Sequence, residues 1–242
     1  MSNDYFRFKQ FCIHQERSAM KVGTDGVLIG TWCTIPDEAK QILDVGGGSG
    51  RIAIMLAQRT EHCRARIKAI DIDHDSTLQS HENVADTPWR DRIDVECVSL
   101  QDFCSREVNE KFDLVVSNPP FFVDSLKAPD PQRNNSRHCD TLSHRELLRC
   151  SAELLKDKGI LAVVLPTNEA KQLVEMSAVY GFVVSRICAV RSTERKAEIR
   201  HLVEMIKTTE WQSCNHTSLC IHSRADYSDE YKALTREFYL KF

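Results

Sequence analysis

The sequence predicts an α/β protein with a doubly wound, mostly parallel sheet of seven strands and an antiparallel hairpin towards its C-terminus. Short apolar runs rich in β-branched residues alternate with amphipathic stretches from residue 41 to residue 180. Two further β-rich runs, residues 182–190 and 199–206, are separated only by a charged segment, which is typical of a hairpin. Ligands of such sheets bind at the carboxyl ends of the strands, so we expect the functional residues there.

The separate elements follow from local patterns. We expect a helix over residues 27–32 capped by Thr24 or Asp25, and another over residues 76–84 capped by Asp73 or Asp75, because these side-chain oxygens can accept a first-turn amide hydrogen. The other expected elements are strands at 41–45, 67–70, 93–98, 112–117, 160–165 and 219–222, and helices at 51–58, 102–108, 147–155 (stopped at Lys158 and Gly159), 168–180 (stopped at Gly181) and 227–240.

Composition fits one domain over residues 1–242, with an N-terminal segment at 1–35, a core at 36–210 and a C-terminal strand and helix at 211–242. Hydrophobic residues make up 42% of the chain, which is enough for a full-sized core. The net charge of −3 and a pI near 6.3 exclude a generally basic nucleic-acid-binding protein, although a local basic patch remains possible.

Several features favour a cytoplasmic protein. The N-terminus carries no apolar h-region, and the longest apolar run, residues 160–165, is too short to span a bilayer, so we expect no signal peptide and no membrane. Ten cysteines occur without any C-x-x-C pair, which indicates scattered reduced thiols rather than disulfides or a metal site. No obligate protein partner can be predicted from the sequence.

A glycine loop, Gly46 to Gly50, lies between the strand at 41–45 and the helix at 51–58, which is the context of a nucleotide-binding turn. Gly46, Gly48 and Gly50 allow the backbone to approach a ligand closely. Asp44 precedes the loop in a D-x-G-x-G-x-G pattern, and a carboxylate at that point would repel a phosphate. S-adenosyl-L-methionine carries a sulfonium and an ammonium group, so the pattern favours this cofactor over a dinucleotide.

Three other positions are expected to border the cofactor. Asp71 ends the next strand about 20 residues beyond the loop, the distance at which an acid reaches ribose hydroxyls. Ser99 follows the third strand and would lie beside the adenine. Thr24 and Asp25 begin a helix that we expect at the border of the same pocket.

Asn118, Pro119, Pro120 and Phe121 follow the buried strand at 112–117 and are the predicted catalytic residues. Proline ends the strand because it has no N–H for the ladder, so Asn118 is expected to point out of the sheet beside the cofactor. The Asn118 side-chain oxygen and the Pro119 carbonyl can each accept one hydrogen of a planar amine, and Phe121 can stack on the attached ring. This arrangement predicts methyl transfer to an –NH2 group.

Two basic segments are candidate RNA-binding surfaces. The loop at 123–143 carries Lys127, Arg133, Arg137 and His138, and the tip of the expected hairpin carries Arg191, Arg195 and Lys196. Both could contact phosphates. Charge is also common in solvated loops and protects edge strands, so both interpretations stay open at each segment.

The residues resemble class I S-adenosyl-L-methionine-dependent methyltransferases, and in particular the bacterial tRNA1(Val) (adenine-N6) methyltransferase family. The likeness is carried by residues 8–11 with 20–28, by 44–121, and by 227–240, and so covers nearly the whole chain. It implies a Rossmann-like fold, S-adenosyl-L-methionine as cofactor, tRNA as partner, and methylation of N6 of the adenosine 3′ of the anticodon. Asn118 to Phe121 is similar to the N-P-P-[YF] motif of amino-group methyltransferases.

Two departures from that family keep other functions open. Ser99 stands where many relatives have Asp, and a hydroxyl accepts a hydrogen bond more weakly than a carboxylate; Phe121 replaces a Tyr. The alternatives are methylation of a protein glutamine amide, methylation of adenine in rRNA or DNA, and a non-catalytic RNA-binding module. The short segment before the glycine loop argues against the glutamine methyltransferase, and the little room for a target-recognition region argues against DNA. The complete glycine loop and the Asn118–Phe121 motif argue against a non-catalytic module.

Overall fold

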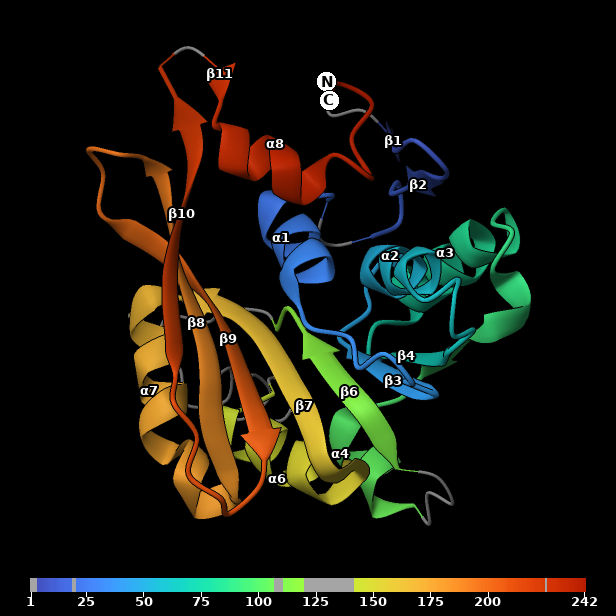
Figure 1. The fold of residues 1–242 in the computed structure, drawn as a ribbon. Helices are drawn as coiled ribbons and strands as arrows, with labels where there is room; N and C mark the ends of the chain where they lie inside the picture. Colours follow the sequence, from blue (N-terminus) through green and yellow to red (C-terminus); the bar gives the residue numbers. More distant parts are fainter. Residues whose placement is uncertain (1–3, 19–20, 107–110, 120–141, 225) are drawn as a thin grey trace, which may run out of the picture.

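The structure is a computed structural model that describes residues 4–18, 21–106, 111–119, 142–224 and 226–242. A nine-stranded sheet runs through it with helices on both faces (Figure 1). Its strands are β3 (Gln41–Val45), β4 (Arg66–Asp71), β5 (Ile93–Cys97), β6 (Phe112–Ser117), β7 (Leu155–Pro166), β8 (Phe182–Thr193), β9 (Glu198–Lys207), β10 (Asn215–Ser223) and β11 (Asp226–Tyr227). A separate hairpin pairs β1 (Tyr5–Arg7) with β2 (Cys12–His14).

The sheet confirms the predicted fold class. Its order is β11-β10-β8-β9-β7-β6-β3-β4-β5, and the five strands from β7 to β5 are parallel. The predicted hairpin is β8 and β9, and β9 lies antiparallel to both β7 and β8. The sheet exceeds the expected seven strands because β10 pairs in parallel with β8 and β11 pairs with β10. The hairpin therefore does not form the sheet edge.

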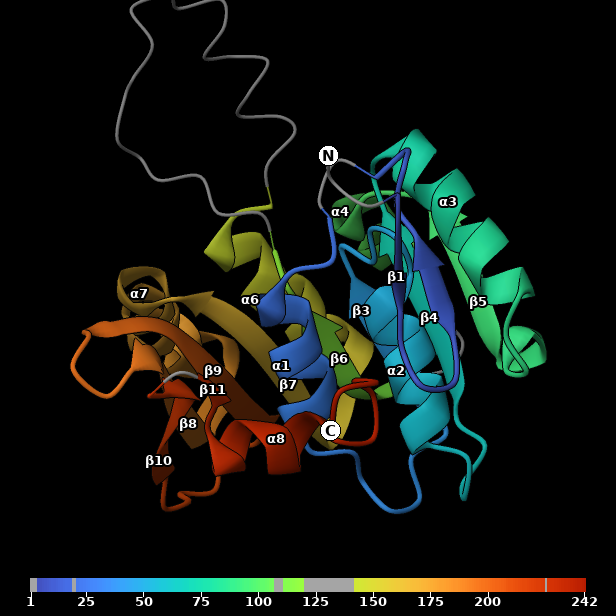
Figure 2. The same cartoon turned by 90° about the horizontal axis from the view of Figure 1, so that it is seen from above.

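Two hydrophobic cores lie on opposite faces of the sheet. The helices α1 (Thr24–Trp32), α2 (Arg51–Arg59) and α3 (His74–Ala85) cover one face, and α8 (Asp229–Thr235) packs on α1 (Figure 2). The helices α4 (Leu100–Ser105), α6 (His144–Leu154) and α7 (Thr167–Ser177) cover the other. Two short 3-10 helices, η1 (Arg90–Arg92) and η2 (Ala178–Tyr180), complete the described elements. No helix within these residues is long and apolar enough to cross a bilayer.

Two of the predicted helix ends are confirmed, and the chemistry of the residues at those ends explains why. Asp73 caps α3 by accepting a hydrogen bond from the Ser76 amide, as expected. Gly181 follows η2 with φ of 80°, in the left-handed region that glycine adopts readily, so the predicted stop is confirmed. The N-cap of α1 is Gly23, and neither Thr24 nor Asp25 caps that helix; both lie in its first turn instead.

Two other expected helix ends were wrong. Lys158 and Gly159 lie inside β7, because α6 ends at Leu154 and the chain turns directly into the strand. The helix expected over residues 227–240 is limited to α8, since the chain beyond it turns back onto the N-terminal hairpin. Aromatic packing at the chain ends outweighs the helical pattern there.

That packing forms an aromatic cluster around Phe8, which is 1% exposed. The Phe8 ring stacks on Phe11 at 4.6 Å and on Tyr239 at 5.9 Å between centroids, and meets Phe238 edge-on at 6.5 Å. The Lys9 amide donates to the Phe238 carbonyl at 2.8 Å. Residues from the two ends of the chain therefore share one piece of the core.

We expect Phe8→Ala to lower the free energy of unfolding by about 3 kcal/mol, since truncating a buried Phe removes apolar contacts and leaves a cavity. Urea denaturation followed by circular dichroism measures the change. Trp211→Ala is the matched control, because Trp211 is 85% exposed and should shift stability by less than about 0.5 kcal/mol. Equal effects of the two substitutions would show that the cluster does not stabilise the fold.

Candidate cofactor and active site

The predicted site residues gather at the carboxyl edge of three neighbouring strands. The strand β3 lies between β4 and β6, with Val45 opposite both Ile70 and Ser117. The next groups along the chain are therefore the glycine loop after β3, Asp71 at the end of β4 and Asn118 after β6, and they lie at three adjacent strand tips. In Figure 1 this edge lies where the β6 arrow ends near α1.

The glycine loop has a backbone that requires glycine. Gly46, Gly48 and Gly50 have φ of 74°, 54° and 79°, where other residues are strained. A Cβ at Gly46 or Gly48 would meet nothing within 4 Å, so this side of the loop is open to a ligand. The amides of Gly46 and Gly47 donate to the Ile70 carbonyl, which ties the loop to β4.

Asp71 is held against the loop by two backbone amides. Its Oδ2 accepts from the Gly48 amide at 2.8 Å, and its Oδ1 accepts from the Asp73 amide at 2.9 Å. Partial burial raises the pKa of the carboxyl above its usual value. Each oxygen retains a lone pair, so the carboxylate can still accept from hydroxyl groups of a sugar.

Asp44 is completely buried beneath the same loop. Its Oδ2 accepts from the Ala53 amide at 3.0 Å, while its Oδ1 has no hydrogen-bond partner among the described residues. Burial raises the pKa of Asp44 to about 7. A buried carboxylate with a free oxygen at an open glycine loop suits a cationic ligand, so this site fits the ammonium end of S-adenosyl-L-methionine.

Asn118 follows β6 directly, and its Oδ1 is buried without a hydrogen-bond partner in the described part of the chain. The preceding Ser117 donates its hydroxyl to the Val45 carbonyl at 2.8 Å, which fixes the tip of β6 to β3. Pro119 is buried next to it. The site thus holds a second unsatisfied acceptor, one strand away from Asp44.

Ser99 lies at the tip of β5 but already has local partners. Its Oγ accepts from the Asp102 amide at 3.0 Å and donates to the Asp102 carboxylate at 2.7 Å, which caps α4. The Val98 amide donates to the Asp71 carbonyl at 2.8 Å, so Ser99 stays near the ribose-binding candidate. A role for Ser99 towards adenine remains a prediction.

The structure joins the start of α1 to the β8–β9 hairpin. Asp25 Oδ2 pairs with Arg200 Nε of β9 at 2.7 Å, while Thr24 begins α1. Near the hairpin tip Arg191 pairs with Glu198 at 2.8 Å, whereas Arg195 and Lys196 are exposed. The other candidates, Pro120, Phe121, Lys127, Arg133, Arg137 and His138, lie outside the described residues.

One polar residue at this edge was not predicted from the sequence. Arg51 is the first residue of α2 and is only 9% exposed, and its guanidinium lies against Gly26 of α1. A charged residue that opens an otherwise apolar helix directly after a glycine loop was the signal available in the sequence.

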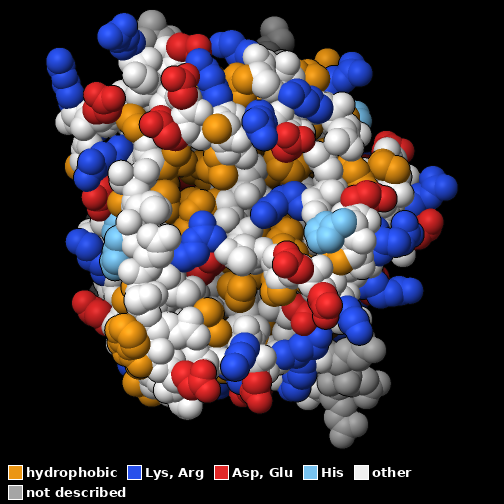
Figure 3. All heavy atoms as spheres, in the orientation of Figure 1, with side chains coloured by type: hydrophobic (Ala, Val, Ile, Leu, Met, Phe, Trp, Pro, Cys, Tyr) orange, Lys and Arg blue, Asp and Glu red, His pale blue; other side chains and the backbone are white. Residues whose placement is uncertain are grey.

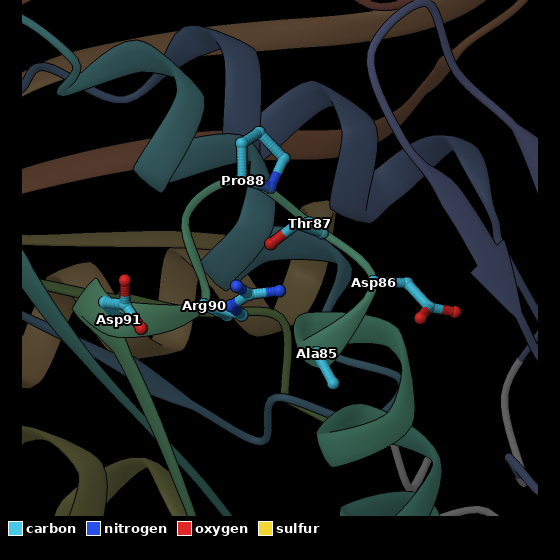
Figure 4. A pocket seen from close by; sticks show the side chains of 6 residues that line it. All are labelled: Ala85, Asp86, Thr87, Pro88, Arg90 and Asp91. Carbon is cyan, nitrogen blue, oxygen red and sulfur yellow. The ribbon is translucent and has the colours of Figure 1, made fainter.

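Two hollows lie away from these residues. One, of about 420 Å³, is lined by Ala85, Asp86, Thr87, Pro88, Arg90 and Asp91 beyond the end of α3 (Figure 4). The other, of about 340 Å³, includes the first residues of β3, β4, β5 and β6, at the amino edge of the sheet. Within the described chain, no group of three or more His, Cys, Asp or Glu is placed to hold a metal ion.

Comparison with known proteins identifies the family of this chain. The family model of the methyltransferase small domain matches residues 27–184, which is more than half of the chain. A relative from Phocaeicola vulgatus, named tRNA1(Val) (adenine(37)-N6)-methyltransferase, is 44% identical over 241 residues and covers 99% of both chains. A relative of the same name from Parabacteroides distasonis is 44% identical over 242 residues, which is all of both chains.

A solved structure of a predicted O-methyltransferase from Agrobacterium tumefaciens shares the fold, with a TM-score of 0.64 and 16% identity over 88% of this chain and 96% of that one. The fold and the strand-tip residues define a class I methyltransferase, an enzyme that uses S-adenosyl-L-methionine. At the level of sequence, the chain belongs to the tRNA1(Val) (adenine(37)-N6)-methyltransferase family.

We expect the affinity for S-adenosyl-L-methionine to rise between pH 5.5 and 7, by up to tenfold per pH unit. The pKa of Asp44 is raised to about 7 in the folded protein. The free energy of unfolding of the protein without cofactor therefore falls as pH rises from about 4 through 7, because the buried carboxyl must ionise. Only the ionised form can accept the ammonium of the cofactor, so binding releases a proton from Asp44.

Isothermal titration calorimetry across this pH range measures the affinity. Asp44→Asn should bind weakly with a nearly flat profile. An affinity that does not change with pH in the unsubstituted protein would contradict contact between Asp44 and the ammonium.

Proposed function

We propose that this chain methylates N6 of an adenosine in tRNA, at position 37 of tRNA1(Val), as the names of its curated relatives state for those proteins. The observation that carries the proposal is the Oδ1 of Asn118, which is buried at a strand tip adjacent to the cofactor loop and has no hydrogen-bond partner among the described residues. Such an acceptor requires a donor, and the exocyclic amine of adenine is one. A tRNA substrate would place the protein in the cytoplasm.

Bound S-adenosyl-L-methionine would supply a methyl group already activated by its sulfonium. The protein then needs neither a metal nor a strong base, and positioning is its main contribution to the rate. Asp44 would hold the ammonium end of the cofactor, and Asp71 its ribose. These contacts would fix the donor above β3 and β4, beside the tip of β6.

Asn118 would act on the acceptor amine. One amine hydrogen would be donated to Asn118 Oδ1 and the other to the Pro119 carbonyl. Two acceptors out of the plane of the base favour a pyramidal nitrogen, whose lone pair then points at the methyl group. The new N–C bond would form as the bond between the methyl group and the sulfonium sulfur breaks, which leaves a neutral thioether, and the nitrogen would then release its extra proton to water. Phe121 is proposed to stack on the base.

The tRNA would dock along the edge that carries these tips. Pro166, at the end of β7, pairs with Arg200, so the β8–β9 hairpin extends beyond the same edge. Arg195 and Lys196 are exposed at its tip and can contact phosphates. Figure 3 shows Lys and Arg interspersed with Asp and Glu on this view, which favours a local contact over a broad basic field.

Transfer of labelled methyl to separate pools of tRNA, rRNA, DNA and protein, followed by nuclease mapping, tests the proposal. Label in tRNA at N6 of adenosine 37 is the expected result. Label confined to rRNA or DNA would replace the proposed substrate, and label in a protein glutamine would replace its chemical class. A protein that binds the cofactor but labels none of the pools would favour the non-catalytic RNA-binding alternative.

Asn118→Ala should lower the single-turnover rate of methyl transfer to tRNA by about 10²–10³-fold, because the amine loses a preorganised partner at the reacting centre. Binding of S-adenosyl-L-methionine, measured by calorimetry, should change little. Asn215→Ala is the matched control, since Asn215 is exposed at the start of β10. An equal loss of cofactor affinity in Asn118→Ala would contradict the assignment of Asn118 to the amine.

A further inference from the structure

Arg51 is a buried cation without a matching hydrogen-bond acceptor. It is 9% exposed, and its Nε has no partner among the described residues. Burial lowers the pKa of its guanidinium, as expected when a charge leaves water. A buried donor that stays unsatisfied is costly, so its persistence at an open ligand loop points to a partner that binds from outside.

Arg51 lies within electrostatic range of Asp44. Both carboxylates that act on its charge, Asp44 and Asp25, belong to the candidate site. Asp25 is paired with Arg200, and none of the ion pairs between described residues joins Arg51 to Asp44. Asp44 Oδ1 and Arg51 Nε are therefore a buried acceptor and a buried donor that leave each other unsatisfied.

The backbone of α1 is shaped to admit the guanidinium. A Cβ on Gly26 would lie 1.8 Å from Nη2 of Arg51 and 2.8 Å from its Nε, so any larger residue there would force the guanidinium to move. The start of α1 has no side-chain cap, and its first-turn amides add positive potential at this place. An anionic group would find a guanidinium and a helix N-terminus together.

We propose that Arg51 binds the carboxylate of the cofactor's amino acid while Asp44 accepts its ammonium. The donor and the acceptor then satisfy the two opposite charges of one zwitterion. A guanidinium suits a carboxylate because its planar N–H groups can donate in pairs. The inference rests on the cofactor of the proposed function, but not on tRNA as the substrate.

Calorimetry with two ligands tests the proposal: S-adenosyl-L-methionine, and its decarboxylated form, which keeps the ammonium and lacks the carboxylate. Arg51→Met should weaken binding of S-adenosyl-L-methionine by about 10- to 100-fold, the range for hydrogen bonds to a charged group. The same substitution should leave binding of the decarboxylated ligand within about twofold. Arg51→Lys should restore part of the affinity, since it retains the charge without the planar fork.

Gly26→Ala provides a second variant that keeps the arginine. Its methyl group would displace the guanidinium. The variant should therefore weaken binding of S-adenosyl-L-methionine but not of the decarboxylated ligand, as Arg51→Met does. Arg66→Met is the control, because Arg66 is exposed at the start of β4. Thermal unfolding of each variant shows whether it is folded.

A purely structural role would give a different pattern. If Arg51→Met weakens both ligands equally, or neither, the proposal is overturned; the same holds if the unsubstituted protein binds both ligands equally. These results do not depend on methyl transfer. If no methyl is transferred to tRNA but Arg51→Met selectively weakens the ligand that has the carboxylate, the proposed function is overturned and the role of Arg51 is supported. If methyl is transferred to tRNA but Arg51→Met has no selective effect, only the proposed function is supported.

Discussion

The register between β4, β3 and β6 is the constraint on which the site depends. Parallel pairing sets Ile70, Val45 and Ser117 side by side, and the Ser117 hydroxyl holds Val45 from the neighbouring strand. The next groups along the three chains are therefore an acid, a glycine turn and an amide, all at one edge. A shift of one residue in any strand would turn its side chains to the opposite face and separate these groups.

Three of the seven buried side-chain polar atoms that lack a hydrogen-bond partner among the described residues lie at the site. Within the described part of the chain, the Oδ1 atoms of Asp44 and Asn118 and the Nε of Arg51 are buried without partners, although most buried polar groups in proteins are paired. Each unmatched atom complements a different part of the reactants: an ammonium, an aromatic amine and a carboxylate. These unpaired atoms lower the stability of the protein without ligands, and ligands that pair with them would raise it again.

Local chemistry in the sequence was sufficient for the fold class, the glycine loop, Asp71 at its strand tip and the Asp73 cap, because each depends on neighbours within a few residues. The missed features depend on contacts between distant segments. Helix α8 is cut short by aromatic residues that pack on Phe8, and Gly23 replaces the expected caps because Asp25 is drawn to Arg200. Arg51 was not among the predicted site residues, because the contact that distinguishes it is with Gly26, which is distant along the chain.

The aromatic cluster around Phe8 has a consequence for how the protein opens. Chain ends usually fray independently of the rest, but here residues from both ends share a core with Val27 and Leu28 of α1. Local unfolding at either end would therefore loosen the helix that borders the cofactor. Amide hydrogens of α1 and of the C-terminal tail should exchange with solvent as one cooperative unit, and bound cofactor would slow exchange in both segments.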